Sequence, residues 1–172
     1  MIVGTGVDVV DMERIAAVLA RQGRRFVRRI LTPEEEAVFE QATPGRQRQY
    51  LAGRFAIKEA VAKAFGTGIG GCIGWHDILT AHENGRPTAK LSAAAQRRWK
   101  QMPALVRVVQ RSDGPAGGGR SSVAGGDLET GIWETLNIHV SISHERRFVV
   151  AQTVVEWNAA IPNPSCQIPK HK

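Results

Sequence analysis

The sequence predicts an α+β domain in which an antiparallel sheet packs on one long central helix. The helix is expected over residues 46–65, which carry the best helical pattern in the chain. The sheet is expected from two hairpins. In the first, residues 77–81 and 86–91 flank Asn-Gly, and in the second, residues 138–143 and 148–155 flank a short charged turn. Because the strand over 148–155 is almost wholly apolar, it should be an interior strand.

The N-terminal segment predicts a further strand over residues 2–10, with alternate side chains on two faces. Gly4 and Gly6 leave one face bare beside Asp8, so another group can approach that carboxylate closely. Asp11 is suited to cap the helix that follows. The simpler interpretation is a glycine-rich strand in which Asp8 or Asp11 serves only as a helix cap.

The composition is that of a globular protein with a basic surface. Apolar residues make up 42% of the chain, which argues against wholesale disorder, and the net charge is +7. A basic chain favours acidic partners, whether nucleic acid, an anionic membrane, a phosphorylated cofactor or an acidic protein. No apolar run approaches the ~20 residues that span a bilayer, and the N-terminus lacks a signal-peptide pattern. With two cysteines giving no disulfide framework, the cytoplasm is the expected compartment.

The basic charge is densest between Arg14 and Pro33, where no acidic residue occurs. This cluster favours a docking surface for a negative partner, although a solvated helix face is the ordinary alternative. A capping-box pattern of Thr32 and Glu35 then predicts a short helix. The arginines of the cluster are Arg21, Arg24, Arg25, Arg28 and Arg29.

One face of the long helix combines small and charged residues. Ala52 and Ala56 are small enough to let this face pack closely on the sheet, and Glu59 and Lys63 continue it. If Asp8 on the first strand meets Glu59 across that packing, two carboxylates with phosphate oxygens and waters would form a typical Mg²⁺ site. Lys63 would then neutralise charge on a phosphate. The competing interpretation is an ordinary surface Glu–Lys pair.

Other constellations are weaker. The glycine loop over residues 66–71 can present backbone amides to phosphate or serve as a flexible connector. Ser143 and His144 are adjacent in a strand and point to opposite faces, which disfavours a nucleophilic triad. Nucleic-acid binding by the arginines lacks a supporting motif, since Phe26 is the only aromatic residue among them. A zinc site is disfavoured because its four candidates match no standard spacing. They are Cys72, His76, Asp77 and His82.

Taken in order, five segments of the chain resemble the holo-acyl-carrier-protein synthases, the small 4′-phosphopantetheinyl transferases. They are GVDVVDMERI at 6–15, LTPEE at 31–35, AGRFAIKEAVAKAFGTGIG at 52–70, NGRP at 84–87 and HVSISHERRFVVAQ at 139–152. The resemblance implies the 4′-phosphopantetheinyl transferase fold in a homotrimer of α+β subunits, with coenzyme A bound between neighbouring subunits. It further implies that phosphopantetheine moves from coenzyme A to a serine of acyl carrier protein for fatty acid biosynthesis, releasing adenosine 3′,5′-bisphosphate.

The resemblance also assigns roles to individual residues. Asp8 and Glu59 match the family's Mg²⁺ ligands, and Lys63 matches the lysine that contacts the pyrophosphate and can protonate the leaving group. The base that takes the serine proton is either Glu59 or a metal-held water. Arg54 and His144 match residues near the adenosine 3′-phosphate. The loop along the nucleotide is Gly66, Thr67 and Gly68, and the residues assigned to carrier docking are Arg14, Arg21 and Arg24.

Two segments depart from the family pattern. A glycine-rich insert over residues 103–137 precedes the strand that carries His144, and residues 158–172 are expected to be a flexible tail after a single domain over 1–157. The insert motivates an alternative acceptor, a carrier domain of a multienzyme fatty-acid synthase. A more distant alternative is a non-enzymatic module that binds acidic protein or nucleic acid through the arginine cluster.

Overall fold

The structure, a computed structural model, describes residues 2–100 and 136–157. Most of the predicted insert, and the whole predicted tail, lie outside these ranges. Leu136 and Asn137, the last two residues of the predicted insert, instead open a strand. In chain order the elements are β1 (Ile2–Asp11), α1 (Met12–Gln22), α2 (Arg24–Ile30), α3 (Pro33–Gln41), α4 (Pro44–Ala64), the 3₁₀ turn η1 (Trp75–Asp77), β2 (Ile78–Glu83), β3 (Arg86–Leu91), α5 (Ala93–Lys100), β4 (Leu136–His144) and β5 (Phe148–Trp157).

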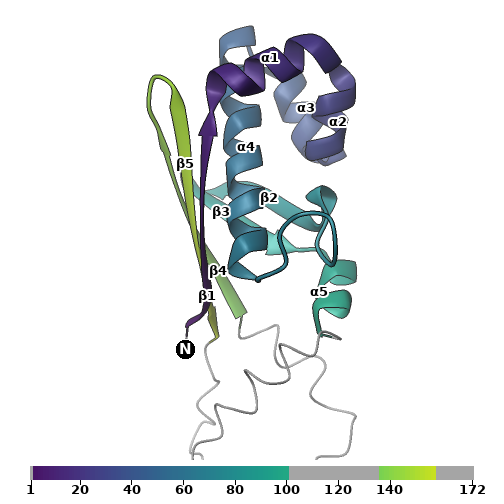
Figure 1. Ribbon diagram of the computed structural model, residues 1–172, viewed down its shortest axis with the longest axis vertical. Coiled ribbons are helices and arrows are strands. Elements are labelled where there is room, and N and C mark those ends of the chain that lie inside the picture. The colour runs from purple at the N-terminus through teal and green to yellow at the C-terminus, as the bar shows by residue number, and fades with distance from the viewer. Residues whose placement is uncertain (1, 101–135, 158–172) are drawn as a thin grey trace, which may run out of the picture.

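The described strands form one antiparallel sheet in the order β1-β5-β4-β3-β2. As predicted, the apolar strand β5 is interior, paired with β1 on one side and β4 on the other. Figure 1 shows α4 running along one face of the sheet, while α1, α2 and α3 gather at one end of it. The predicted fold class, an antiparallel sheet packed on a long helix, is therefore confirmed.

The close approach expected beside Asp8 is made by α4 itself. A Cβ atom at Gly4 would lie 2.0 Å from the Ala64 carbonyl oxygen, and one at Gly6 would lie 2.0 Å from that of Ala60. No side chain fits at either position, so the bare strand face lets the helix backbone rest directly on β1. This contact sets the depth at which the C-terminal half of α4 stands beside Asp8.

The helix starts follow the predicted capping signals. Asp11 Oδ1 accepts the Glu13 amide at 2.9 Å, and Thr32 forms a reciprocal capping box with Glu35. Gly23 (φ +53°) separates α1 from α2 with a left-handed backbone, which favours glycine. None of the described helices is both long and apolar enough to cross a membrane.

The two predicted hairpins are also present. Asn84 (φ +52°) and Gly85 (φ +77°) turn the chain between β2 and β3, with the left-handed backbone that an Asn-Gly turn needs. Ser92 Oγ then accepts the Ala95 amide at 3.1 Å and caps α5. The second hairpin, β4–β5, joins the first through pairing of Thr88 with His139, which completes the sheet.

Candidate active site

Asp8 and the end of α4 form a compact charged group. Lys63 Nζ donates to Asp8 Oδ1 at 2.7 Å and to the Val7 carbonyl oxygen at 3.0 Å. Helical side chains tilt toward the helix N-terminus, so Lys63 reaches back over the turn that carries Glu59. As expected from the sequence, Lys63 meets Asp8, and Glu59 is near enough for the charges of both to act on it. Metal binding by the two carboxylates stays a prediction.

The negative charge of Asp8 acts on Glu59. Partial burial raises the pKa of Glu59, the negative charge of Asp8 raises it further, and Lys63 opposes both effects. A partly buried carboxyl group beside a second carboxylate suits a divalent cation, because the cation offsets the repulsion between the two negative charges, and hard carboxylate oxygens fit Mg²⁺. Within residues 2–100 and 136–157, no group of three or more His, Cys, Asp or Glu side chains could hold a metal. The fit is therefore to an ion held by two carboxylates and completed by phosphate oxygens and waters, as is common for Mg²⁺.

A second group of candidate residues lines a cavity of about 300 Å³ between α4 and the sheet. The buried Arg54 guanidinium lies 4.7 Å from the centre of the Tyr50 ring and donates to His82 Nδ1 at 3.1 Å. Its Nε is also buried and lacks a hydrogen-bond partner among the described residues. Because position 53 is glycine, His144 Nε2 comes within 3.4 Å of where a Cβ would stand.

Arg54 and His144 thus line one cavity, as the resemblance implied, and their contact with a 3′-phosphate stays a prediction. His82 was not identified from the sequence as part of this group. No sequence signal pointed to it, because its partner is 28 positions away along the chain. Burial lowers the pKa of His82, with a further lowering from Arg54, and burial alone lowers that of His144. The cavity therefore favours neutral histidines beside a permanently charged guanidinium.

The Arg54 group and the Lys63 group lie on opposite sides of α4. Nine residues at ~100° per residue place Lys63 about half a turn around the helix from Arg54. The strand order gives the same result. Lys63 contacts Asp8 on the edge strand β1, whereas Arg54 contacts His82 on β2 at the other edge. The two groups of candidate residues on one copy of the chain therefore face different directions.

The glycine loop uses three of its backbone amides in hydrogen bonds to α4. The Thr67 and Gly68 amides both donate to the Ala62 carbonyl oxygen, at 3.1 and 3.3 Å, and the Gly66 amide donates to that of Lys63. These three amides close the C-terminal turn of α4 and are not free to bind phosphate, whereas phosphate binding by the other amides of the loop stays a prediction. Whether the loop lies along a nucleotide, as the resemblance implies, stays a prediction.

The sequence suggested an arginine cluster without acidic neighbours, but in the structure two of these arginines pair with acidic residues of α3. Arg24 pairs with Glu36 and Glu40, and Arg28 Nε donates to Glu36 at 3.2 Å, because α3 folds back beside α2. These ion pairs could not be predicted from the sequence, because the paired residues lie on different helices. Three arginines of the cluster line an open hollow of about 840 Å³ and have no acidic partner among the described residues. They are Arg21, Arg25 and Arg29. Arg14 is exposed on α1.

The weaker candidates do not form sites in the described part of the chain. Three of the four residues weighed as zinc ligands have separate partners: His82 contacts Arg54, His76 Nε2 contacts the Arg28 carbonyl oxygen, and Asp77 accepts from Ser92 and Arg98. The alternation of β4 turns His144 toward the α4 cavity, and Ser143 takes the opposite face.

Comparison with known proteins shows the family to which the chain belongs. The sequence profile of the 4′-phosphopantetheinyl transferase superfamily matches residues 4–110, and the chain belongs to this family. A holo-[acyl-carrier-protein] synthase of Geobacillus kaustophilus is 41% identical over 157 residues, which cover 91% of this chain and 90% of that protein.

Solved structures agree with the sequence comparison. The synthase of Neisseria meningitidis is 34% identical with a TM-score of 0.64, over 91% of this chain and 99% of that one. The synthase of Bacillus anthracis in complex with CoA (3′,5′-ADP) is 30% identical with a TM-score of 0.63, over 92% and 99%. The resemblance found in the sequence motifs is therefore confirmed.

Proposed function

We propose that this protein transfers 4′-phosphopantetheine from coenzyme A to a serine hydroxyl of apo acyl carrier protein, using Mg²⁺ held by Asp8 and Glu59. The observation that carries the proposal is the grouping of Asp8, Glu59 and Lys63 where β1 meets α4. It is supported by relatives named holo-[acyl-carrier-protein] synthase and by a relative's complex with CoA (3′,5′-ADP).

The chemistry follows from the charges that this group provides. The serine oxygen attacks the β-phosphorus of coenzyme A, the bridging phosphorus–oxygen bond breaks, and adenosine 3′,5′-bisphosphate leaves. Phosphoryl transfer of this kind depends on charge neutralisation and positioning. Mg²⁺, when bound, supplies charge neutralisation at the phosphates. Lys63 Nζ donates a proton toward the leaving phosphate oxygen. The raised pKa of Glu59 suits its carboxylate to take the serine proton, with a water as the alternative acceptor.

In this proposal the Arg54 group and the Lys63 group are two half-sites of one shared site, and their placement supports assembly of several copies. A nucleotide held by Arg54 and His144 of one copy reaches a catalytic group only if a neighbour presents its own Asp8, Glu59 and Lys63. The sheet face that no described element covers supplies a contact surface, because Val7, Val9 and Val150 are 53%, 59% and 37% exposed. The homotrimer implied by the family resemblance is thus part of the proposal.

Intact-mass spectrometry of a carrier protein tests the proposal directly. Apo acyl carrier protein is incubated with this protein and coenzyme A, with Mg²⁺ or with EDTA. The expected result is a gain of one phosphopantetheine with Mg²⁺ and none with EDTA. A carrier domain from a multienzyme synthase, tested in parallel, decides between the two acceptors. Absence of the gain on both acceptors would contradict the proposed function.

A further inference from the structure

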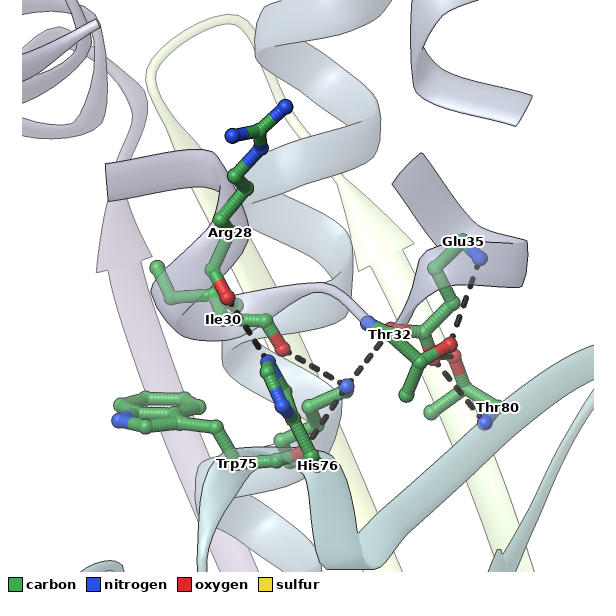
Figure 2. Close-up of polar contacts among 8 residues, drawn as sticks. Arg28, Ile30, Thr32, Glu35, Trp75, His76 and Thr80 are labelled. Atoms are coloured by element: carbon green, nitrogen blue, oxygen red, sulfur yellow. Dashed lines mark hydrogen bonds and ion pairs between the residues drawn. The ribbon is translucent and has the colours of Figure 1, made fainter. Parts of the chain in front are cut away.

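A buried lysine next to Glu59 holds three separate segments together. Lys58 is fully buried, and its Nζ donates to Glu35 Oε2 at 2.6 Å, to the Ile30 carbonyl oxygen at 2.8 Å and to the Trp75 carbonyl oxygen at 3.0 Å. An ammonium group has three hydrogens to donate, so this set uses all of them. The partners come from the end of α2, the start of α3 and η1, as Figure 2 shows.

Glu35 extends the same network to β2. Its Oε2 accepts the Thr32 amide at 3.0 Å, and its Oε1 accepts the Thr80 amide at 3.1 Å as well as the Thr80 hydroxyl. A second link runs beside it, because His76 Nε2 contacts the Arg28 carbonyl oxygen at 2.8 Å. Figure 2 shows both links reaching carbonyl groups in the last turn of α2, those of Arg28 and Ile30.

These contacts fix the C-terminal end of α2 on α4. The last four carbonyl groups of a helix have no partner within it, and Lys58 satisfies one of them at Ile30. The helix held in this way carries Arg25 and Arg29, two of the arginines that line the open hollow. Lys58 also directly precedes Glu59 in α4. The residue that holds the arginine-bearing helix α2 in place is therefore next in the chain to the candidate catalytic carboxylate.

Stability alone does not account for this arrangement. A buried ion pair is weak evidence for stability, because desolvation of the two charges offsets most of their attraction, and apolar residues of similar size often serve as well. Burial lowers the pKa of Lys58, and the charge of Glu35 opposes that effect. Apolar residues cannot form directional hydrogen bonds. The three donors of Lys58 fix two carbonyl groups and one carboxylate in a single geometry.

We propose that Lys58 is a positioning residue that sets the place of α2 and its arginines relative to Glu59, so that a docked carrier presents its serine at the correct distance. This inference rests on the proposed function. Displacement of a reacting group by about 1 Å can lower a rate about 100-fold. A shift of α2 on α4 would therefore weaken transfer, while the hydrogen bonds of Lys58 and Glu35 do not include Arg54 or His144, the candidate coenzyme A residues.

The test uses Lys58→Met combined with Glu35→Gln. Lys58→Met alone leaves a buried carboxylate unpaired and is expected to unfold the chain, whereas the double variant removes both charges together. The matched control is Arg98→Met with Asp77→Asn. It breaks another ion pair, which links η1 to α5, and Arg98 Nε also donates to the Cys72 carbonyl oxygen. Transfer kinetics and amide hydrogen exchange are measured for each protein.

For the double variant we expect kcat/KM for the carrier to fall at least about tenfold, with KM for coenzyme A within about twofold of wild type. Amides of α2 should exchange faster, while those of β1 and β5 stay protected. The control pair should leave carrier kinetics unchanged. A folded double variant with wild-type carrier kinetics would overturn the inference, as would an equal loss for both substrates. An inactive wild-type protein would instead overturn the proposed function.

Discussion

Lys63 Nζ lies 2.7 Å from Asp8 Oδ1, and this contact ties the catalytic end of α4 to the first strand of the sheet. It joins residues 55 positions apart, and Gly4 and Gly6 make it possible by letting the helix backbone rest on β1. Glu59 stands one turn before Lys63, so one cation and two carboxylates share a small volume. That grouping has consequences for both activity and stability.

Removing charge from the carboxylates should separate activity from stability. Asp8→Asn and Glu59→Gln are each expected to lower kcat for transfer at least ~100-fold, because charge stabilisation at the phosphates is lost. The raised pKa of Glu59 means that its charge is disfavoured in the folded state. Glu59→Gln should therefore melt at the same temperature as wild type or higher in EDTA, measured by calorimetry. A clear loss of stability, or wild-type kinetics, would contradict the assignment.

Local signals predicted local structure well. The Thr32 cap, the Asn84-Gly85 turn and the helix that bears Glu59 all depend on neighbours within a few residues, and each is present. The long-range polar contacts were missed. Glu35 was interpreted only as the partner of Thr32, yet it also accepts from Lys58, 23 positions away. Periodicity and capping carry no information about such pairs, because they arise only when helices pack.

Arg54 and Glu59 should complement each other between copies. Arg54→Gln and Glu59→Gln are each expected to inactivate the protein, because each removes one half-site from every copy. In a mixed cyclic trimer, about one of the three interfaces combines an intact Arg54 half with an intact Glu59 half. Co-expression with two different tags and purification through both should therefore recover up to about a third of wild-type activity. Mixed oligomers that remain inactive, or an active wild-type monomer, would contradict a shared site.

Adjacent arginines should differ in their effect on the carrier. Arg25 lines the open hollow, whereas Arg24 pairs with Glu36 and Glu40. Arg25→Gln should raise KM for acyl carrier protein several-fold and weaken its dependence on salt, because long-range attraction to an acidic partner is reduced. Arg24→Gln should leave this KM near wild type and lower stability by less than ~1 kcal/mol, as expected for an exposed ion pair. Steady-state kinetics at two salt concentrations measure both. An unchanged KM in Arg25→Gln would place docking elsewhere, and an equal rise in both variants would show that Arg24 also contacts the carrier, as the family resemblance implied.

A methyl group at Gly6 should disturb the contact between the strand and the helix. The added Cβ would stand 2.0 Å from the Ala60 carbonyl oxygen, which is backbone and cannot move aside alone. Gly6→Ala should lower the free energy of unfolding by about 3 kcal/mol or more. Gly45→Ala is the matched control, since a Cβ there meets nothing within 4 Å and should be neutral or stabilising by ~0.4–1 kcal/mol. Urea unfolding compares the two, and a tolerated Gly6→Ala would contradict the packing.

Stability should rise with pH between about 5 and 7.5 because of His82 and His144. Burial lowers the pKa of both from 6.5, with Arg54 adding to the effect at His82. The unfolded chain then binds more protons than the folded chain below pH 6.5, so folding is penalised as pH falls. Glu59 acts in the opposite direction, because its raised pKa favours the folded state at low pH. Urea unfolding is therefore measured in a Glu59→Gln background, where His82→Gln with His144→Gln should flatten the slope. A slope of the opposite sign, or one that survives both substitutions, would show that these histidines are not held neutral in the cavity.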